Sequence, residues 1–174
     1  MYNNFMKLTV YMAISIDGLI TCGDNDSDWV SDNDWEQFYS YIKANDAVIM
    51  GRKTMEQFGE DFPIEGPLNI VLTNNTDLHK ESDNLIILSA SPQEIIDLAV
   101  KKGLNNLLLI GGSETNKQFI EAGLVDEIVL SVHPLVIGRG LHLFGSDPLD
   151  VNLELVSTKA INNELVQIVY EVRK

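Results

Sequence analysis

The feature that most restricts the fold of this chain is the alternation of short apolar runs with helical patterns. The clearest helical patterns are "SDNDWEQFYSYI", "SPQEIIDLAVKKG" and "SETNKQFIEAG", each lying between two apolar runs. Such alternation is typical of a largely parallel α/β sheet with helices on its faces. We therefore predict an α/β fold with eight strands, at Leu8–Ile16, Ala47–Met50, Leu68–Leu72, Leu85–Leu88, Asn106–Ile110, Val125–Val132, Leu153–Ala160 and Leu165–Val172.

The helical patterns carry start and stop signals. Ser91 is placed to cap one helix, with Pro92 at its first position, Glu94 completing a capping box and Gly103 ending it. The pattern "SETNKQFIEAG" starts at Ser113, which is interpreted as an ordinary N-cap, and ends at Gly123. The first pattern has Ser31 and Asp34 at capping-box spacing, followed by apolar residues at i, i+3, i+4 and i+7: Trp35, Phe38, Tyr39 and Ile42.

The last two strands are separated only by Asn162 and Asn163, so we expect an antiparallel hairpin that closes one edge of the sheet. The chain has 174 residues, with no internal repeat, low-complexity segment or linker. Residues 1–174 are therefore predicted to form one domain.

Composition narrows the classes of partner. A formal net charge of −14 argues against nucleic acid or an anionic membrane surface as a partner. The single cysteine, Cys22, allows no internal disulfide, and the three scattered histidines have no zinc-site spacing, so no metal is predicted. No apolar run reaches the ~20 residues of a membrane span, and "MKLTVYMAISIDG" fits a first strand better than a leader. We expect a cytoplasmic protein.

Two turns after apolar strands are candidates for binding an anion. In "VIMGRKT", Gly51 allows close approach of the backbone, Arg52 and Lys53 are two of only twelve basic residues, and Thr54 can cap a helix or contact a phosphate. A solvated surface turn explains the same residues about equally well. The helix dipole disfavours cations at a helix start, which favours the anion-binding interpretation.

The second turn, Gly111-Gly112-Ser113, joins a buried strand to a helix and could seat a pyrophosphate, or could simply be a tight turn. Neither turn matches the G-x-G-x-x-G or G-x-x-x-x-G-K-[ST] patterns. The two turns together favour a dinucleotide site that is split between them.

These residues carry a family resemblance. "ISIDGLIT", "VIMGRKTMEQFG", "NIVLTNN" and "LIGGSETNKQFIEAGLVDEIVLSVHPLVIGRGLHLFG" occur in the order found in the dihydrofolate-reductase-like superfamily. The chain most resembles the C-terminal reductase domain of the bacterial bifunctional deaminase–reductase of riboflavin biosynthesis. The resemblance implies a three-layer α/β/α fold, a mixed and mostly parallel eight-stranded sheet, NADPH as cofactor and a homodimer. Ser113 replaces a frequent third glycine, and no deaminase half is present, so we expect a separate reductase.

The resemblance also implies roles for individual residues. Those implied to bind the cofactor are Gly51, Arg52, Lys53 and Thr54 at the adenosine and 2′-phosphate, Leu72, Thr73 and Asn74 at the adenine ribose, Ile110, Gly111, Gly112, Ser113, Glu114 and Thr115 at the pyrophosphate, and Ala13 and Ile20 at the nicotinamide.

Further residues are candidates for contacting a small-molecule substrate. "WVSDNDWEQF" resembles the W-x4-D-x3-F segment of dihydrofolate reductase and supplies Trp29, Asp34 and Phe38. Asp34 and Phe38 are four residues apart, so they share one helix face, where a carboxylate beside an aromatic ring suits a pterin-like substrate. We predict Asp34 as the catalytic group, with the alternative that it only completes the capping box. Asp17 and Arg139 are weaker candidates. A turn before Gly18 is the favoured explanation of Asp17, and Arg139 either meets a substrate phosphate or simply lies in a flexible loop.

Dihydrofolate reductase itself is the competing interpretation. Pro67 in "IEGPLNIVLT" stands where that enzyme has the arginine that grips the folate carboxylate, which disfavours folate. A protein that binds a dinucleotide without turnover is the alternative of another class. The favoured function is hydride transfer from NADPH to a small heterocycle or a phosphoribosylaminopyrimidine, as in 5-amino-6-(5-phosphoribosylamino)uracil reduction.

Overall fold

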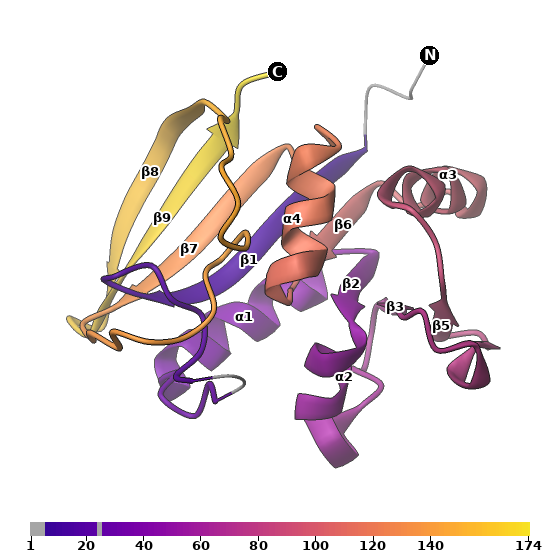
Figure 1. Cartoon of the computed structure of the whole chain (residues 1–174), viewed down its shortest axis with the longest axis horizontal. Helices are drawn as coiled ribbons and strands as arrows, with labels where there is room; N and C mark the ends of the chain where they lie inside the picture. The colour runs from indigo at the N-terminus through magenta and orange to yellow at the C-terminus, as the bar shows by residue number, and fades with distance from the viewer. Residues whose placement is uncertain (1–5, 24–25) are drawn as a thin grey trace.

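A nine-stranded sheet runs through the molecule in the computed structural model, which describes residues 6–23 and 26–174 (Figure 1). The strand order is β4-β5-β3-β2-β6-β1-β7-β9-β8. Six neighbouring strands are parallel: β5 (Leu85–Leu88), β3 (Leu68–Leu72), β2 (Ala47–Gly51), β6 (Asn106–Leu109), β1 (Lys7–Ser15) and β7 (Glu127–His133). The mixed, mostly parallel α/β fold predicted from the sequence is confirmed.

The edges of the sheet are antiparallel. At one edge, β8 (Leu153–Ile161) and β9 (Leu165–Val172) form the expected hairpin, and Asn162 and Asn163 adopt φ angles of 48° and 57°. Asparagine tolerates this left-handed region better than most residues, which explains the pair at the turn. At the other edge, β4 (Lys80–Glu81) makes the ninth strand, so the expected count of eight is wrong by one. Two exposed polar residues carry no periodic signal that a sequence could reveal.

Helices cover both faces of the sheet. On one face, α3 (Pro92–Lys102) and α4 (Ser113–Glu121) contribute Ile95 and Phe119 to one hydrophobic core. On the other face, α1 (Asp32–Ala44) contributes Phe38 and Ile42 to a second core, which Met55 and Phe58 of the short helix α2 (Arg52–Phe58) extend. Figure 1 shows α4 in front of the sheet and α1 behind it. This is the predicted three-layer arrangement.

The helix starts differ in how they are capped. Ser91 and Glu94 form the expected capping box on α3, and Gly103 ends that helix at φ 73°. The N-cap of α4 is Gly112, whereas Ser113 was expected to cap it. The Ser113 hydroxyl instead donates to the carbonyl of His142 at 2.6 Å and accepts the N–H of Gly145 at 2.9 Å. Ser113 therefore links residues 142–145, which follow β7, to the start of α4 through two hydrogen bonds.

The buried face of α1 also differs from the expected apolar stripe. Asp34, Phe38 and Ile42 are buried, while Trp35 and Tyr39 are 37% and 40% exposed. Beneath α1, the strand β1 presents the hydroxyl of Tyr11, which donates to the carboxylate of Asp34. The helix therefore turns Asp34 toward the sheet, and the indole of Trp35 stays partly exposed.

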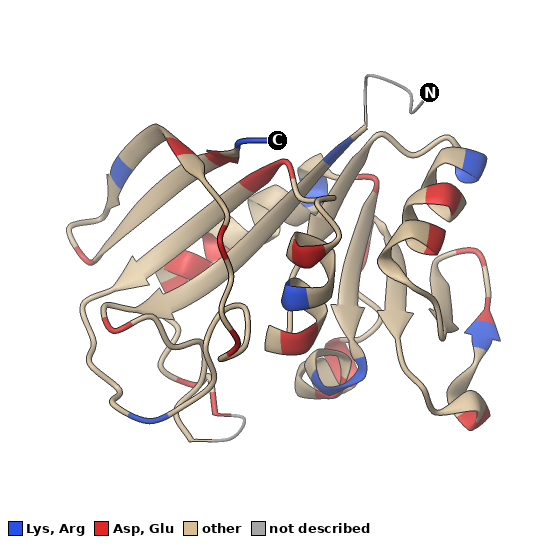
Figure 2. Cartoon of the chain, turned by 45° about the horizontal axis from the view of Figure 1, so that its top comes forward, with Lys and Arg blue, Asp and Glu red and all other residues tan. Residues whose placement is uncertain are grey.

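The charges are spread over the whole molecule. Figure 2 shows acidic residues on helices, strands and loops, with the basic residues scattered among them. Among the helices of the described residues, none is long and apolar enough to cross a membrane.

Candidate active site

A cavity of about 1250 Å³ lies where the parallel strands end. Ligands of open α/β sheets bind at this edge, because helix N-termini and loops meet there. Fourteen of the predicted cofactor residues line the cavity: Ala13, Ile20, Gly51, Arg52, Lys53, Thr54, Leu72, Thr73, Asn74, Ile110, Gly112, Ser113, Glu114 and Thr115. Gly111 does not line it, but lies directly behind, against the side chain of Met12.

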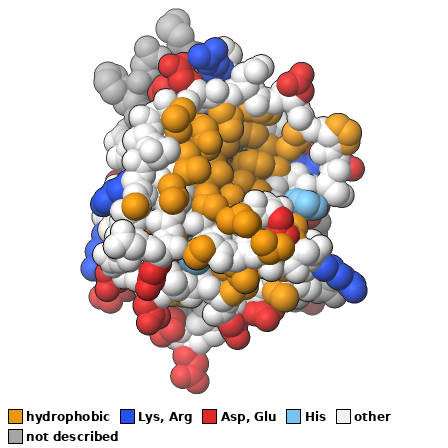
Figure 3. Space-filling model, turned by 90° about the vertical axis from the view of Figure 1, so that its left-hand side faces the viewer, with side chains coloured by type: hydrophobic (Ala, Val, Ile, Leu, Met, Phe, Trp, Pro, Cys, Tyr) orange, Lys and Arg blue, Asp and Glu red, His pale blue; other side chains and the backbone are white. Residues whose placement is uncertain are grey.

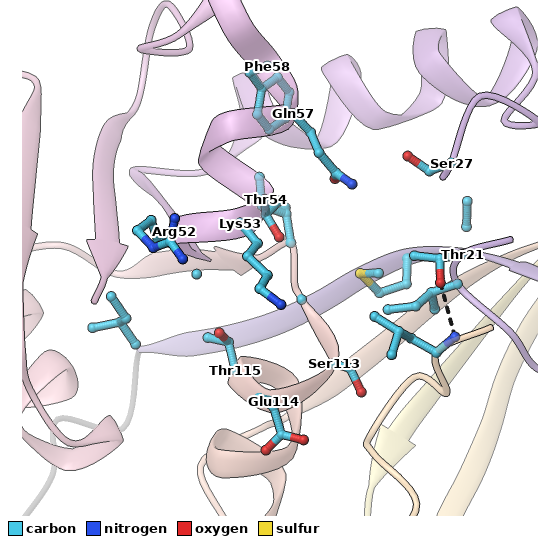
Figure 4. A pocket seen from close by; sticks show the side chains of 18 of the residues that line it. Thr21, Ser27, Arg52, Lys53, Thr54, Gln57, Phe58, Ser113, Glu114 and Thr115 are labelled. Carbon is cyan, nitrogen blue, oxygen red and sulfur yellow. Dashed lines mark hydrogen bonds between the residues drawn. The ribbon is translucent and has the colours of Figure 1, made fainter. Parts of the chain in front are cut away.

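The basic turn forms the first residues of α2. Gly51 is the N-cap, and no acidic residue follows in the first turn to offset Arg52 and Lys53. Arg52 makes an ion pair with Glu56 one turn on, where both side chains are well exposed, so the pair is weak. Lys53 extends into the cavity toward the start of α4 (Figure 4), and no other described residue pairs with it. A cation at a helix start, with no partner among the residues that the structure describes, is suited to an arriving anion.

The glycine turn packs directly against the basic turn. The N–H of Gly51 donates to the carbonyl of Gly111 at 2.8 Å. A Cβ at position 51 would lie 2.7 Å from the hydroxyl of Thr115, so only glycine fits between the two turns. Gly111 has φ 106°, a value that glycine adopts without strain, and the peptide bond between Gly111 and Gly112 is cis.

The start of α4 fits the phosphates of a dinucleotide. Its N-cap, Gly112, lines the cavity and has no side chain to cap the first-turn N–H groups. Uncapped N–H groups at a helix start bind phosphate readily. Figure 4 shows the carboxylate of Glu114 pointing away from Lys53, so it does not cancel the positive charge of that ammonium group. The predicted pyrophosphate seat is therefore compatible with the geometry.

At the other end of the cavity, Asp34 is a buried carboxylate with an exposed fraction of 1%. Its Oδ1 accepts the hydroxyl proton of Tyr11 at 2.5 Å, and its Oδ2 lies 3.9 Å from Nε2 of His133. Ser31 does cap α1, accepting the N–H of Asp34 at 3.3 Å. The reciprocal half of the box is missing, because the N–H of Ser31 donates to His133 Nε2 at 3.3 Å. The interpretation of Asp34 as a capping-box acid is thus wrong.

A hydrogen-bond network fixes the Asp34 carboxylate. Nδ1 of His133 lies 3.1 Å from the carbonyl of Ser131, which assigns the ring proton to Nδ1 and leaves Nε2 as the acceptor for Ser31. The Tyr11 hydroxyl also lies 3.0 Å from Oγ of Ser131. Burial, and then the charge of Asp34, raise the pKa of Tyr11 well above its usual range. Tyr11 therefore stays protonated and donates to Asp34 at any physiological pH.

Three predicted substrate residues lie outside the cavity lining, and Asp17 is the clearest of them. Its exposed carboxylate accepts the backbone N–H groups of Ile137 at 3.1 Å and Gly138 at 2.7 Å. A hydrogen bond from Ser15, followed by these two backbone donors, lowers the pKa of Asp17 to about 2. Asp17 therefore fastens the segment after β7, and the expectation that it contacts substrate is not supported.

Trp29 and Arg139 are the other two predicted substrate residues that lie outside the cavity lining. Trp29 packs its ring edge-on against His133, with 5.1 Å between centroids, and so supports the network around Asp34 from outside the cavity. Arg139 is exposed, and only its backbone carbonyl makes a described contact, with the N–H of Gly23 at 2.9 Å. Of the substrate candidates, Asp34 and Phe38 line the cavity.

Other residues of the cavity wall were missed by sequence reasoning. Tyr11 comes from the middle of a buried strand, where aromatic residues ordinarily serve packing. Gly140 lies so close to the 19–22 segment that a Cβ would meet the carbonyl of Thr21 at 1.8 Å. The N–H of Ile20 donates to the carbonyl of Leu141 at 2.8 Å beside it. In the Gly138-Arg139-Gly140 triplet it is Gly140, and not Arg139, that shapes the cavity.

The lining is electrostatically asymmetric. Arg52 and Lys53 lie where β2 ends, while Asp28, Asp32 and Asp34 line the opposite end. Within the described lining, no lysine or arginine accompanies these three carboxylates. One end thus suits an anionic ligand, and the other suits a ligand with N–H or O–H donors.

Comparison with known proteins agrees with this geometry. Residues 6–167 match the RibD C-terminal domain family. The chain is 30% identical over 173 residues to the uncharacterized protein YwjB of Bacillus subtilis (strain 168), covering 94% of this chain and 97% of that protein. It is also 32% identical over 110 residues to dihydrofolate reductase of Candida albicans, covering 62% of this chain and 56% of the enzyme.

Solved structures share the fold. A putative riboflavin biosynthesis protein from Shewanella sp. PV-4 superposes with a TM-score of 0.79 and 25% identity, over 97% of this chain and 100% of that one. Dihydrofolate reductase from Enterococcus faecalis, complexed with NADP(H), gives 0.75 and 21%, over 97% of each chain. The deaminase/reductase of Thermotoga maritima gives 0.80 and 17%, over 97% of this chain and 57% of that one. This chain belongs to the RibD C-terminal domain family and has the dihydrofolate-reductase-like fold.

Proposed function

We propose that this chain is an NADPH-dependent reductase that transfers hydride to a small heterocycle of the phosphoribosylaminopyrimidine type. One observation carries the proposal: a single cavity joins Lys53, which no described residue pairs with, and an uncapped helix start to a buried, hydrogen-bonded carboxylate. The first two features suit a phosphorylated cofactor, and the carboxylate suits a ring with N–H donors.

The chain's own residues divide the work of holding the cofactor. Arg52 and Lys53 bind the 2′-phosphate, and the first-turn N–H groups of α4 bind the pyrophosphate. Ala13 and Ile20 line the same cavity and bound the nicotinamide. NADPH, when bound, supplies the hydride. The protein's contribution is to align the two reactants and to exclude water between them.

Asp34 binds the substrate ring and delivers the proton that balances hydride transfer. Hydride adds to the carbon of a C=N or C=O bond, and a proton must reach the nitrogen or oxygen. The Tyr11 hydroxyl holds Oδ1, so Oδ2 is the oxygen left to meet the ring. The proton that Asp34 gives up is replenished from water that enters the cavity between turnovers. His133, whose Nε2 accepts the N–H of Ser31 and lies 3.9 Å from Oδ2, helps to position the carboxylate.

The acidic end of the cavity bears on the choice of substrate. A phosphate placed beside Asp28, Asp32 and Asp34 would meet like charge without a basic residue of the described lining to offset it. We therefore propose that the ring enters this end first and that any phosphate stays away from it.

Dihydrofolate is the second candidate substrate, because a carboxylate and an aromatic ring of one helix, Asp34 and Phe38, both line the cavity. Pro67 is buried and does not line the cavity, so the described lining offers no arginine there for the glutamate tail. The aminopyrimidine therefore remains the favoured substrate, and dihydrofolate the second candidate.

Two measurements on the wild-type chain test the proposal. Fluorescence titration with NADPH and NADH should show tighter NADPH binding, reported by Trp35 in the cavity wall. Single-turnover oxidation of bound NADPH is then followed with the phosphoribosylaminopyrimidine, its dephosphorylated form and dihydrofolate. Failure to bind either nucleotide would overturn the proposal. NADPH binding without oxidation by any of the three would favour the alternative, a dinucleotide-binding protein without turnover.

A further inference from the structure

The end of the cavity opposite the cofactor turns carries carboxylates that the described protein leaves without partners. Asp28 and Asp32 line this end, and both side chains are exposed. Their carboxylates make no hydrogen bond or ion pair with another residue that the structure describes. A positive group that arrives beside them is favoured, because an opposite charge within a few ångströms stabilises a carboxylate.

The buried carboxylate at the same end gives separate evidence for a ligand. Asp34 is 1% exposed and lines the cavity, and its Oδ1 accepts the hydroxyl proton of Tyr11. Its Oδ2 has no hydrogen-bond donor among the described residues, because Nε2 of His133, 3.9 Å away, accepts the N–H of Ser31. A buried carboxylate oxygen without a donor is unfavourable until a ligand supplies one. This end is therefore built to receive a ligand and is more than an acidic surface.

Aromatic rings accompany the exposed carboxylates. Trp35 lines the cavity and is 37% exposed, and its ring meets those of Phe38 and Phe58 edge-on, with 5.4 and 6.5 Å between centroids. Positive groups bind to aromatic faces as well as to carboxylates. Asp32 and Trp35 also border an open depression that continues along α1 to Tyr39. A substituent that extends outward from the bound ring would therefore pass acidic and aromatic side chains.

A phosphate on the substrate has no comparable place. Arg52 and Lys53 are the lysine and arginine residues of the described lining, and both lie at the cofactor end. Under the proposed function, the 2′-phosphate and pyrophosphate of NADPH occupy that end. Arg139, the other candidate for a substrate phosphate, is exposed and does not line the cavity. A phosphorylated substrate would thus add negative charge where the described lining offers no cation.

The surface around the cavity has the same bias. The chain has a formal net charge of −14, with acidic residues on helices, strands and loops (Figure 2). On the side where β8 and β9 lie, Figure 3 shows an apolar area with acidic and basic side chains at its rim, and the basic ones lie apart from one another. The described surface on this side thus gathers no positive charge that would draw a phosphate, whereas a negative field speeds the arrival of a cation.

We propose that the heterocyclic substrate carries no phosphate and bears a positively charged amino substituent, which lies beside Asp28, Asp32 and Trp35. The inference rests on the proposed function, because it keeps the ring and the hydride transfer of that proposal. It changes the charge of the substituent, from the negative charge of a phosphoribosyl group to a positive one.

Three probes with one ring test the charge of the substituent. Each is an aminouracil whose amino group carries a two-carbon arm, which ends in an ammonium, a hydroxyl or a phosphate group. Isothermal titration calorimetry measures their affinity for the wild-type chain with NADP⁺ bound and, separately, without nucleotide. The ammonium probe should bind about 5–10-fold more tightly than the hydroxyl probe, and the phosphate probe about 5–10-fold more weakly. Equal binding of the three, preference for the phosphate, or binding of none would overturn the proposal.

A double variant tests which residues read the charge. Asp28→Asn/Asp32→Asn keeps the shape of both side chains and should bring the three affinities to within about threefold of one another. Asp83→Asn/Asp97→Asn is the matched control, because it removes two exposed carboxylates outside the cavity lining and should keep the wild-type order. A full preference for the ammonium probe in Asp28→Asn/Asp32→Asn would place the positive group elsewhere and overturn the assignment.

Salt dependence of the wild type covers the case in which Asp28→Asn/Asp32→Asn does not fold. Because salt screens exposed charges, affinity for the ammonium probe should fall as salt is added and affinity for the phosphate probe should rise. The opposite dependence would overturn the proposal. Failure of the proposed function is seen separately, as failure to bind NADPH or to oxidise it, because the order of the probes without nucleotide depends only on the acidic end.

Discussion

The two ends of the cavity are built in different ways. The cofactor end consists of short local segments, residues 51–54 and 111–115, whose polar groups reach the cavity directly from helix starts. The opposite end joins Tyr11, Asp34 and His133 from β1, α1 and β7, all of them buried and hydrogen-bonded. Binding a phosphorylated cofactor needs charge and free N–H groups at a surface, whereas holding a carboxylate for proton transfer needs burial with compensating donors.

The largest expected effect comes from removing the charge at the buried end. Asp34→Asn keeps the shape of the side chain and an acceptor for Tyr11, but cannot transfer a proton. We expect single-turnover hydride transfer to fall by about 10²–10⁴-fold, the usual range for general acid–base catalysis. NADPH affinity should stay within about threefold, since the cofactor end is untouched.

Glu36→Gln is the control for Asp34→Asn, because it removes an exposed carboxylate from the same helix outside the cavity. It should retain wild-type turnover. Unchanged turnover in Asp34→Asn would show that Asp34 has only a structural role. The end of the cavity around Asp34 would then have no catalytic function to set against the cofactor end.

The exposed end is tested by Arg52→Ala/Lys53→Ala. We expect NADPH to bind about 10–100-fold more weakly and NADH to change little, because only NADPH carries the 2′-phosphate. The preference of the wild type for NADPH should likewise decrease as salt is added, since exposed charges are screened. Lys101→Ala/Lys102→Ala removes the same charge from the last turn of α3 and should leave both affinities unchanged. Equal weakening of NADPH and NADH would place the basic turn against a part that the two cofactors share.

Tyr11→Phe tests whether the buried donor matters in addition to the carboxylate. A hydrogen bond to a charged group contributes about 1.5–3 kcal/mol, so we expect kcat to fall by about 10–100-fold with NADPH affinity unchanged. Tyr41→Phe is the control, because the Tyr41 ring packs on Tyr11 at 4.9 Å without contacting Asp34. Equal losses in the two variants would assign the effect to packing.

Sequence reasoning succeeded where local pattern determines structure. The strand–helix alternation gave the sheet, and glycine, serine and basic residues marked both turns of the cofactor end. It missed the buried end because Tyr11, Asp34 and His133 become neighbours only through the strand order, across up to 122 positions. A tyrosine within an apolar run and a histidine at a strand end look like packing residues until the partner strand is known.

The same limit explains the errors at Asp17 and Arg139. Asp17 resembled a turn residue or a substrate contact, yet its partners are backbone N–H groups 120 and 121 positions away. Backbone donors leave no trace in the identity of the residues that carry them. Arg139 attracted attention through its charge, while the neighbouring Gly140 makes the close contact with Thr21.

Asp17 gives the smallest expected effect, because it belongs to neither end of the cavity. Its pKa of about 2 lies below the ordinary value of 3.8, so the ionised form is favoured when the loop is fastened. A lowered pKa means that this stabilisation is complete above about pH 4 and is lost as the pH falls toward 2. The backbone amide shifts of Ile137 and Gly138 should therefore change little between about pH 5 and pH 3. In Asp17→Asn both amides should shift at every pH, with turnover within about twofold of wild type. An amide titration centred near pH 4 would show that the two N–H groups do not favour the charged carboxylate in solution, and Asp17 would then be available to the cavity mouth.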